Sequence, residues 1–246
     1  MVIIGGRAHT IEQIHEVGAL GYPYAEISLN DPDEVESSLA RYLLLKEEYG
    51  ISYLAHYPNE DNPFDVDVLQ QRFVPRIKRL IDLSLELGID KGTIHFWIDK
   101  RWAPPGLIDR KLPILEELVE CAVDRGLDLC IENLSERYDS FARAFDAIPD
   151  LYMTLDIGHG QLLSKENTSY NFIRHYFPRI RHVHVHDNRG GTGVKDDLHL
   201  ALGMGIVDYR DILSQLKEKG YSSTITMEVK PHDMPRTRDE LELVFG

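Results

Sequence analysis

Short apolar runs alternate along the chain with longer segments in which apolar residues recur every three or four positions. The short runs, rich in β-branched and aromatic residues, predict eight strands, at residues 2–4, 25–29, 53–57, 93–97, 129–133, 152–157, 181–186 and 224–229. Apolar stripes within residues 35–43, 77–85, 115–122 and 212–216 predict helices between them. Each stripe is followed by a glycine able to adopt the left-handed conformation that ends a helix, at Gly50, Gly88, Gly126 and Gly220.

Strands that alternate with helices favour parallel pairing through crossover helices, and eight such units suit a closed barrel. The sequence therefore predicts the α/β class and a single (β/α)8 TIM barrel domain over residues 1–246. The alternative is an open doubly wound sheet, which commonly carries G-x-G-x-x-G after its first strand. Here only Gly5 and Gly6 follow that strand, and we interpret them as a turn.

The charge balance bears on the choice of partner. The formal net charge is −14, with 41 acidic and 27 basic residues, so long-range repulsion makes duplex nucleic acid an unlikely partner. No apolar run approaches the roughly 20 residues that span a bilayer, and the segment MVIIGGRAHT lacks the pattern of a secretory signal. We expect a cytoplasmic protein with no membrane association. Cys121 and Cys130 show no C-x-x-C spacing and are expected to be buried structural thiols.

Six of the predicted strands end on imidazole or carboxylate side chains. These strand-end residues are His56, His95, Glu132, Asp156 with His159, His184 and Glu228, and the segment DLHLALGMG adds Asp197 and His199. The carboxyl ends of parallel barrel strands share one rim, where barrel enzymes build their active sites. We therefore expect these nine side chains to converge there.

Carboxylates at the ends of apolar strands need a compensating charge, because desolvating them alone is costly. The only basic residues inside or beside these runs are Arg181 and Lys230, so a salt-bridge network is the weaker alternative. Imidazole and carboxylate without thiolate suit zinc, manganese, iron or cobalt. The sequence therefore predicts one to three divalent metal ions per chain, with zinc or manganese preferred.

Three alternating histidines leave open which residue of the strand at 181–186 is the metal ligand. His182, His184 and His186 alternate with valines, so their side chains point to the same face at different depths. Periodicity alone does not say which one binds a metal. Asp187 either accepts a hydrogen bond from a ligating imidazole or opens the following loop.

These residues together resemble the xylose isomerase-like barrel superfamily, which contains the endonuclease IV family and many sugar isomerases and epimerases. The resemblance covers all eight predicted strands and rests on His56, His95 and the motifs IEN, LDIGH, HVHD, DLHLALGMG and MEV. Similarity to endonuclease IV, with its three zinc ions, implies three sets: His56, His95 and Glu132; Glu132, Asp156, His184 and Glu228; and His159, Asp197 and His199. The sugar isomerases typically keep only the second set. The lack of Arg/Lys-rich loops speaks against cleavage of abasic DNA.

Two activities and one non-catalytic role follow. The number of ligands favours a phosphoesterase acting on a small sugar phosphate or a nucleotide-like molecule, in which clustered ions activate water and Glu132 or Glu228 orients it. The alternative is a mononuclear sugar or sugar phosphate isomerase or epimerase, in which Glu132 and Glu228 act as acid and base through an enediolate. A second alternative is a sugar- or metal-binding barrel without catalysis.

Residues near the predicted mouth are candidates for contacting the substrate. The aromatic candidates for stacking on a sugar or base are Tyr57, Phe64, Trp97 and Trp102, and the candidates for binding a phosphate are Arg7, Arg101, Arg189 and Lys230. Lys230 is preferred among the cations because it lies two residues beyond Glu228, on the same face of the predicted strand. The expected partner is a small sugar or phosphorylated molecule, and the sequence leaves the oligomeric state open.

Overall fold

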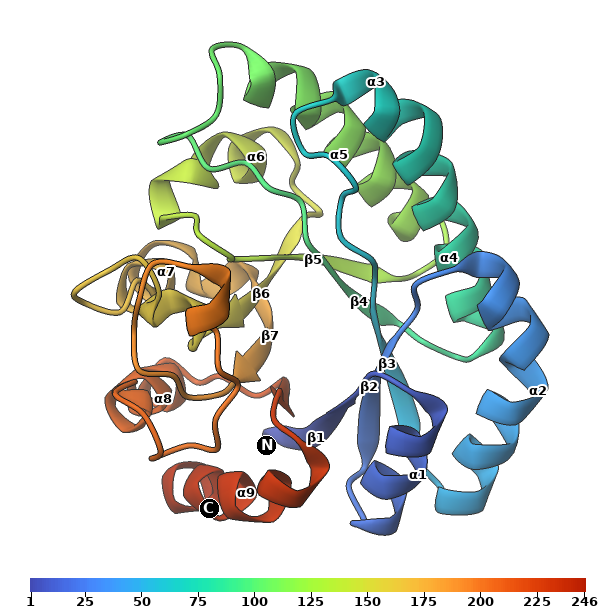
Figure 1. Ribbon diagram of the computed structural model, residues 1–246, viewed down its shortest axis with the longest axis vertical. Helices are drawn as coiled ribbons and strands as arrows, with labels where there is room; N and C mark the ends of the chain where they lie inside the picture. The colour runs from blue at the N-terminus through green and yellow to red at the C-terminus, as the bar shows by residue number, and fades with distance from the viewer.

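The computed structural model describes residues 1–246 and contains a closed barrel of eight parallel strands (Figure 1). The strands are β1 (Ile3–Ala8), β2 (Tyr24–Ser28), β3 (Ser52–His56), β4 (Lys91–Ile94), β5 (Asp128–Glu132), β6 (Tyr152–Asp156), β7 (Ile180–Val185) and β8 (Thr224–Met227). Each strand pairs with the next, and β8 pairs with β1. This confirms the predicted (β/α)8 barrel and excludes the open sheet.

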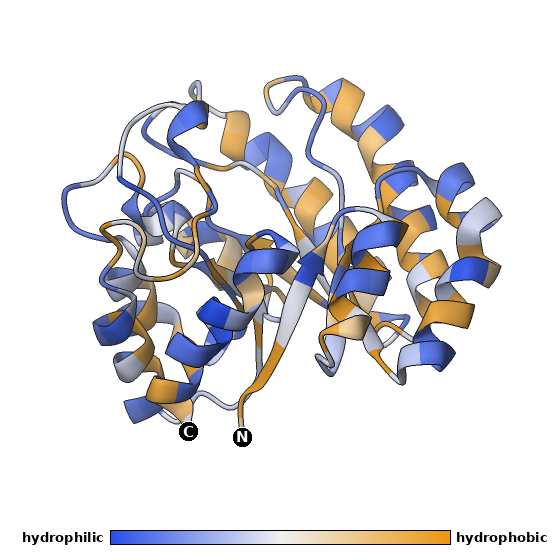
Figure 2. Ribbon diagram, turned by 60° about the horizontal axis from the view of Figure 1, so that its bottom comes forward, coloured by the Kyte–Doolittle hydropathy of each residue, from blue (hydrophilic) through white to orange (hydrophobic).

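The helices surround the barrel as a ring. They are α1 (Ile11–Ala19), α2 (Pro32–Tyr49), α3 (Val66–Val68), α4 (Val74–Glu86), α5 (Leu107–Val123), α6 (Ala142–Ala147), α7 (Ser169–Tyr176), α8 (Tyr209–Glu218) and α9 (Met234–Phe245). Figure 2 shows hydrophobic and hydrophilic residues alternating along the helices. The four glycines expected after helices all have positive φ, from 62° at Gly50 to 85° at Gly220. None of these helices combines the length and the apolar composition needed to cross a bilayer.

The first strand is longer than the sequence predicted. Gly5 and Gly6 lie inside β1 rather than in a turn, so that interpretation was wrong. A Cβ on Gly5 would come within 2.5 Å of the Tyr24 ring, and one on Gly6 within 2.6 Å of the Met234 sulfur. The glycines are therefore needed for close packing on both faces of the strand, and β1 continues through Arg7 to the rim.

The barrel has an apolar outside and a polar inside. Its outer face packs on the helices through a continuous hydrophobic core. Inside, side chains are joined by hydrogen bonds, such as Tyr24 Oη to Thr226 Oγ1 at 3.1 Å and Thr93 Oγ1 to Thr154 Oγ1 at 2.8 Å. This polar filling lies below the titratable residues of the rim.

Both cysteines are unpaired and buried, as expected. Burial raises the pKa of the Cys130 thiol to about 12, which keeps it protonated and unreactive at neutral pH.

Candidate metal centre

Four of the predicted ligands form a compact group at the carboxyl ends of β5 to β8. Glu132, Asp156, His184 and Glu228 each offer one donor atom, and these atoms lie within 4.8 Å of one another. All four side chains are buried. His184 is central to the group, because its Nδ1 lies 3.3 Å from Glu132 Oε1 and 3.5 Å from Glu228 Oε2. We call these four residues the central group.

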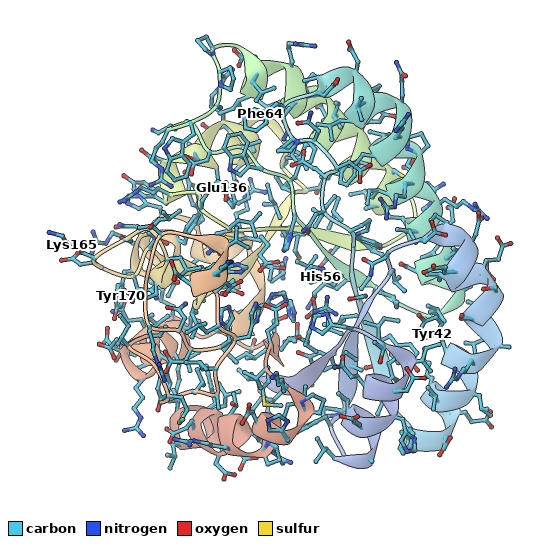
Figure 3. All side chains as sticks on the ribbon, viewed as in Figure 1. Tyr42, His56, Phe64, Glu136, Lys165 and Tyr170 are labelled. Carbon is cyan, nitrogen blue, oxygen red and sulfur yellow. The ribbon has the colours of Figure 1, made fainter.

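Two further groups flank the central group. His56 and His95 gather at Glu132, with His95 Nε2 lying 2.7 Å from Glu132 Oε2. Figure 3 shows His56 near the middle of the ring of helices. On the other side, one group contains His159, His186, Asp197 and His199. The structure thus brings all nine predicted residues together and adds His186, one of the three histidines among which the sequence pattern left the ligand open.

Local structure positions two of these side chains. The Asn133 side chain bonds to both the N–H and the carbonyl of Asp156, at 2.9 Å each, and so clamps β5 to β6. His199 has φ of 46°, in the left-handed region that a residue with a side chain rarely adopts. In this conformation its Nδ1 lies 2.9 Å from the carbonyl oxygen of Glu228, and its Nε2 lies 3.0 Å from Asp197 Oδ2.

Unpartnered carboxylate oxygens indicate that the site fits a cation. Asp156 Oδ2, Glu228 Oε2 and Asp197 Oδ1 are buried and accept no hydrogen bond. Buried polar atoms without a partner are rare in folded proteins, and a divalent ion would compensate these oxygens.

The histidines are oriented as ligands would be. His56 Nδ1 lies 3.2 Å from the Tyr57 carbonyl oxygen, and His159 Nδ1 lies 3.1 Å from the Asn133 carbonyl oxygen. An N–H donated to a carbonyl leaves the second ring nitrogen as the ligand atom. That nitrogen, Nε2, lies 3.5 Å from Glu132 Oε2 in His56 and 3.2 Å from Asp197 Oδ2 in His159. The residues present therefore fit divalent metal ions.

The pKa shifts of the centre also indicate that its carboxylates need positive charge beside them. Burial raises the pKa of Glu228, but His184, with His199 and Arg7, outweighs burial and holds it at about 2. Burial lowers the pKa of His199, but Asp197 and Glu228 outweigh it and raise the pKa to about 9. Protonated imidazoles would compensate the carboxylates, and a metal ion would supply the same charge.

Arg7 is engaged in a way that the sequence did not reveal. Its side chain is 4% exposed, and its Nε lies 3.4 Å from Glu228 Oε1. It also donates to Ser28 Oγ at 2.8 Å and to the Glu26 carbonyl at 3.1 Å. Most of its donors are used inside the protein, but Arg7 also lines the cavity described below, so its contact with a phosphate stays a prediction. The sequence offered no signal for this role, because the strand was predicted to end at residue 4.

The structure separates the three alternating histidines by depth. His182 lies deepest and bonds to Glu26 Oε2 at 2.8 Å, while His186 lies highest, with Nε2 3.1 Å from Asp156 Oδ1. Sequence reasoning missed Glu26, although an acidic residue within the apolar run YAEIS was a visible signal. Asp187 accepts backbone N–H groups from its own loop, including Gly205 at 2.8 Å, so it organises that loop.

A cavity of about 450 Å³ opens beside the flanking groups, and Arg7, His9, Asn59, Arg76, His95 and His199 are among the residues that line it. Tyr57 was expected to contact a substrate; it borders this cavity, but its ring points away from the barrel interior. It is 1% exposed, and its hydroxyl lies 3.0 Å from Ser84 Oγ on α4. Trp97 is half-buried and packs on Phe64, with ring centroids 5.1 Å apart. Arg189 and Lys230 are exposed and do not line this cavity.

Several proteins are similar in sequence to this chain. The L-ribulose 3-epimerase of Methylomonas sp. (strain DH-1) is 25% identical over 226 residues, which cover 85% of this chain and 74% of that protein. The inosose dehydratase of Yersinia enterocolitica is 25% identical over 135 residues, covering 46% of this chain and 45% of the dehydratase. An uncharacterized protein of Methanocaldococcus jannaschii, MJ1311, is 28% identical over 77% of this chain and 69% of its own length.

Solved structures show the same fold. A D-tagatose 3-epimerase-like protein superposes with a TM-score of 0.83 at 25% identity, covering 99% of this chain and 98% of the other. The IOLI protein, solved with a binding zinc atom, superposes with a TM-score of 0.76 at 15% identity, over 99% of each chain.

The relatives with named activities are enzymes, namely sugar epimerases and a dehydratase, which confirms the expectation that this chain is an enzyme. They favour the isomerase or epimerase alternative over the phosphoesterase that the ligand count had favoured. The family model described as a xylose isomerase-like TIM barrel matches residues 14–244. The chain belongs to the xylose isomerase-like TIM barrel family.

Proposed function

We propose that this protein is a divalent-metal-dependent sugar epimerase or isomerase that moves a proton on the carbon next to the substrate's carbonyl. The observation that carries the proposal is the central group, in which three carboxylates and one imidazole converge within 4.8 Å. The names of the relatives support the choice of a sugar as substrate.

The central group would hold the ion, with zinc or manganese suiting its ligands. When bound, the ion would polarise the substrate's carbonyl. Two of the ligands, Glu132 and Glu228, project from strands separated by β6 and β7 and so approach the substrate from different directions. One would remove the proton and the other would return it to the opposite face, which inverts that carbon.

The ionisation of the glutamates suits this role. Burial raises the pKa of Glu132, but His184 and His95 outweigh it and hold the pKa well below the usual value, so the group is a carboxylate at neutral pH. Arg7 engages only Oε1 of Glu228, and Oε2 accepts no hydrogen bond. Glu228 Oε2 could therefore bind the metal ion or accept a proton from the substrate.

The cavity beside the site suits a small polyhydroxylated molecule. Its volume of about 450 Å³ falls within the usual range of small-molecule sites, and most of its lining residues are polar. Its cationic and imidazole side chains include Arg76 and His9, neither of which the sequence had indicated.

The proposal is tested by incubating the metal-loaded protein with a panel of ketoses and sugar phosphates and separating the products. Conversion to an epimer or aldose, lost on chelation and restored by Mn²⁺ or Zn²⁺, is the expected result. Stable sugars with release of inorganic phosphate from the phosphorylated substrates would contradict it.

A polynuclear phosphoesterase is the second candidate, because the structure brings nine ligands into three adjacent groups. It requires the flanking groups to hold ions that turnover depends on. His56→Ala and His199→Ala would then abolish phosphate release, whereas an epimerase that uses only the central group would retain its ion in both variants.

A further inference from the structure

A buried carboxylate inside the barrel lies beneath the central group and belongs to none of the three ligand sets. Glu26, in the middle of β2, has no exposed surface. Its Oε2 accepts a hydrogen bond from His182 Nε2 at 2.8 Å, and both of its oxygens lie 3.0 Å from His184 Nε2. No lysine or arginine side chain pairs with this carboxylate, so imidazoles alone face its charge.

The His184 ring connects this carboxylate to the metal centre. Its Nε2 faces Glu26, and its Nδ1 faces Glu132 Oε1 at 3.3 Å and Glu228 Oε2 at 3.5 Å. An ionised carboxylate only accepts hydrogen bonds, so the contact with Glu26 requires a proton on Nε2. In a neutral imidazole protonated there, Nδ1 carries a lone pair, and that lone pair points at the central group.

We propose that Glu26 is a positioning residue for the metal centre, holding His184 as the tautomer whose Nδ1 binds the ion. A carboxylate behind a ligating histidine fixes the ring and makes it a stronger ligand. This inference rests on the metal site proposed above and adds a residue that lies too deep to touch a substrate in the cavity.

His182 also contacts Glu26, but it has a different role from His184. Its Nε2 faces Glu26 and lies 3.1 Å from Thr226 Oγ1, and its Nδ1 lies 2.7 Å from Thr224 Oγ1. Both ring nitrogens are engaged below the central group. His182 therefore holds the Glu26 carboxylate in place and is not a ligand, whereas His184 is.

Glu26→Gln tests the inference, because the carboxamide preserves size but presents an N–H₂ group to one of the two rings. We expect the Zn²⁺ dissociation constant, measured by competition with a chromogenic chelator, to rise about 10–100-fold. In ¹⁵N NMR spectra of the labelled variant, the His184 ring should no longer be protonated at Nε2 in every molecule. Tyr53→Phe is the control, since the buried Tyr53 hydroxyl bonds to the Tyr42 carbonyl on α2 and has no contact with Glu26 or its histidines. It should leave both measurements at wild-type values.

A Glu26→Gln variant with the wild-type Zn²⁺ constant and an unchanged His184 tautomer would overturn the inference and leave the proposed function intact. If that variant does not fold, the inference is tested by the ligand atom of His184 in the zinc-loaded wild-type protein. A zinc-loaded wild-type protein in which His184 binds through Nε2 would refute the role of Glu26, and one in which Nδ1 is the ligand supports it. Wild-type protein that binds no Zn²⁺ at all would overturn the proposed function and this inference together.

Discussion

Arg7 on β1 and Glu228 just after β8 form a buried ion pair, with Nε 3.4 Å from Oε1. Because β1 and β8 are the strands that close the barrel, this pair joins the two ends of the sheet at the rim of the metal centre. It holds one oxygen of Glu228 and leaves the other directed at the site. The same contact thus serves the closure of the fold and the orientation of a proposed catalytic group.

Arg7→Met should destabilise the protein by about 3 kcal/mol, because it removes the one arginine that pairs with the buried Glu228 carboxylate and leaves only imidazoles beside it. Urea unfolding of the ion-free protein measures this loss. The control is Arg41→Met, which removes an ion pair with Glu12 whose side chains are 59% and 70% exposed, and should cost below about 1 kcal/mol. Equal effects of the two substitutions would show that the Arg7 pair contributes no more than a surface contact.

Glu132→Gln and Glu228→Gln should each lower sugar turnover by about 10²-fold or more, since each removes a group that transfers a proton. Both amides keep an oxygen for the metal, so the metal content should be measured alongside the rate. The matched control is Glu36→Gln, at an exposed residue that pairs with Arg79, and it should retain wild-type turnover. Full activity of either site variant with normal metal content would exclude that glutamate as acid or base.

Elemental analysis should find a single tightly held ion per chain, retained in both His56→Ala and His199→Ala. The reason is that the central group contains neither histidine. Asp156→Ala, which removes a member of the group, should lose the ion. Two or three ions in the wild-type protein, with loss in the histidine variants, would instead favour the phosphoesterase.

Lys111→Met should also be strongly destabilising. Lys111 Nζ lies 2.6 Å from Glu60 Oε1 and 2.6 Å from the Trp97 carbonyl, and its side chain is fully buried. Its loss leaves Glu60 uncompensated, at a cost of about 3–5 kcal/mol in denaturant unfolding.

The double variant Lys111→Met with Glu60→Gln should recover part of this stability, because it removes the uncompensated charge as well. Lys100→Met is the control, since Lys100 pairs with Asp139 at the surface. A double variant no more stable than Lys111→Met alone would mean that packing of the lysine stem, rather than its charge, supports this region.

The fold was predictable from the sequence because local signals agreed with one another. The apolar runs gave all eight strands within a few residues, and the glycines after the helices marked their ends. The first strand was the exception. Its glycines resembled a turn, and only the packing of Tyr24 and Met234 against them explains why they belong to the strand.

The ligands of the centre were predictable because strand ends meet at one rim, but side-chain depth and partners were not. Arg7 and Glu26 act inside the barrel, and their contacts depend on how β1, β2 and β7 are brought together. The direction of the Tyr57 ring, by contrast, could have been predicted. Neighbouring residues of a strand face opposite sides, so the inward direction of His56 already placed the Tyr57 ring in the helix layer.

The most direct test of the proposed function is the uptake of solvent deuterium. Metal-loaded protein is incubated with a panel of ketoses in D₂O, and each recovered sugar is analysed by NMR. The proposal predicts deuterium at the carbon next to the carbonyl of a substrate ketose, lost on chelation and in Glu132→Gln and Glu228→Gln. Metal-dependent turnover of a sugar in the panel without any deuterium at that carbon would contradict it.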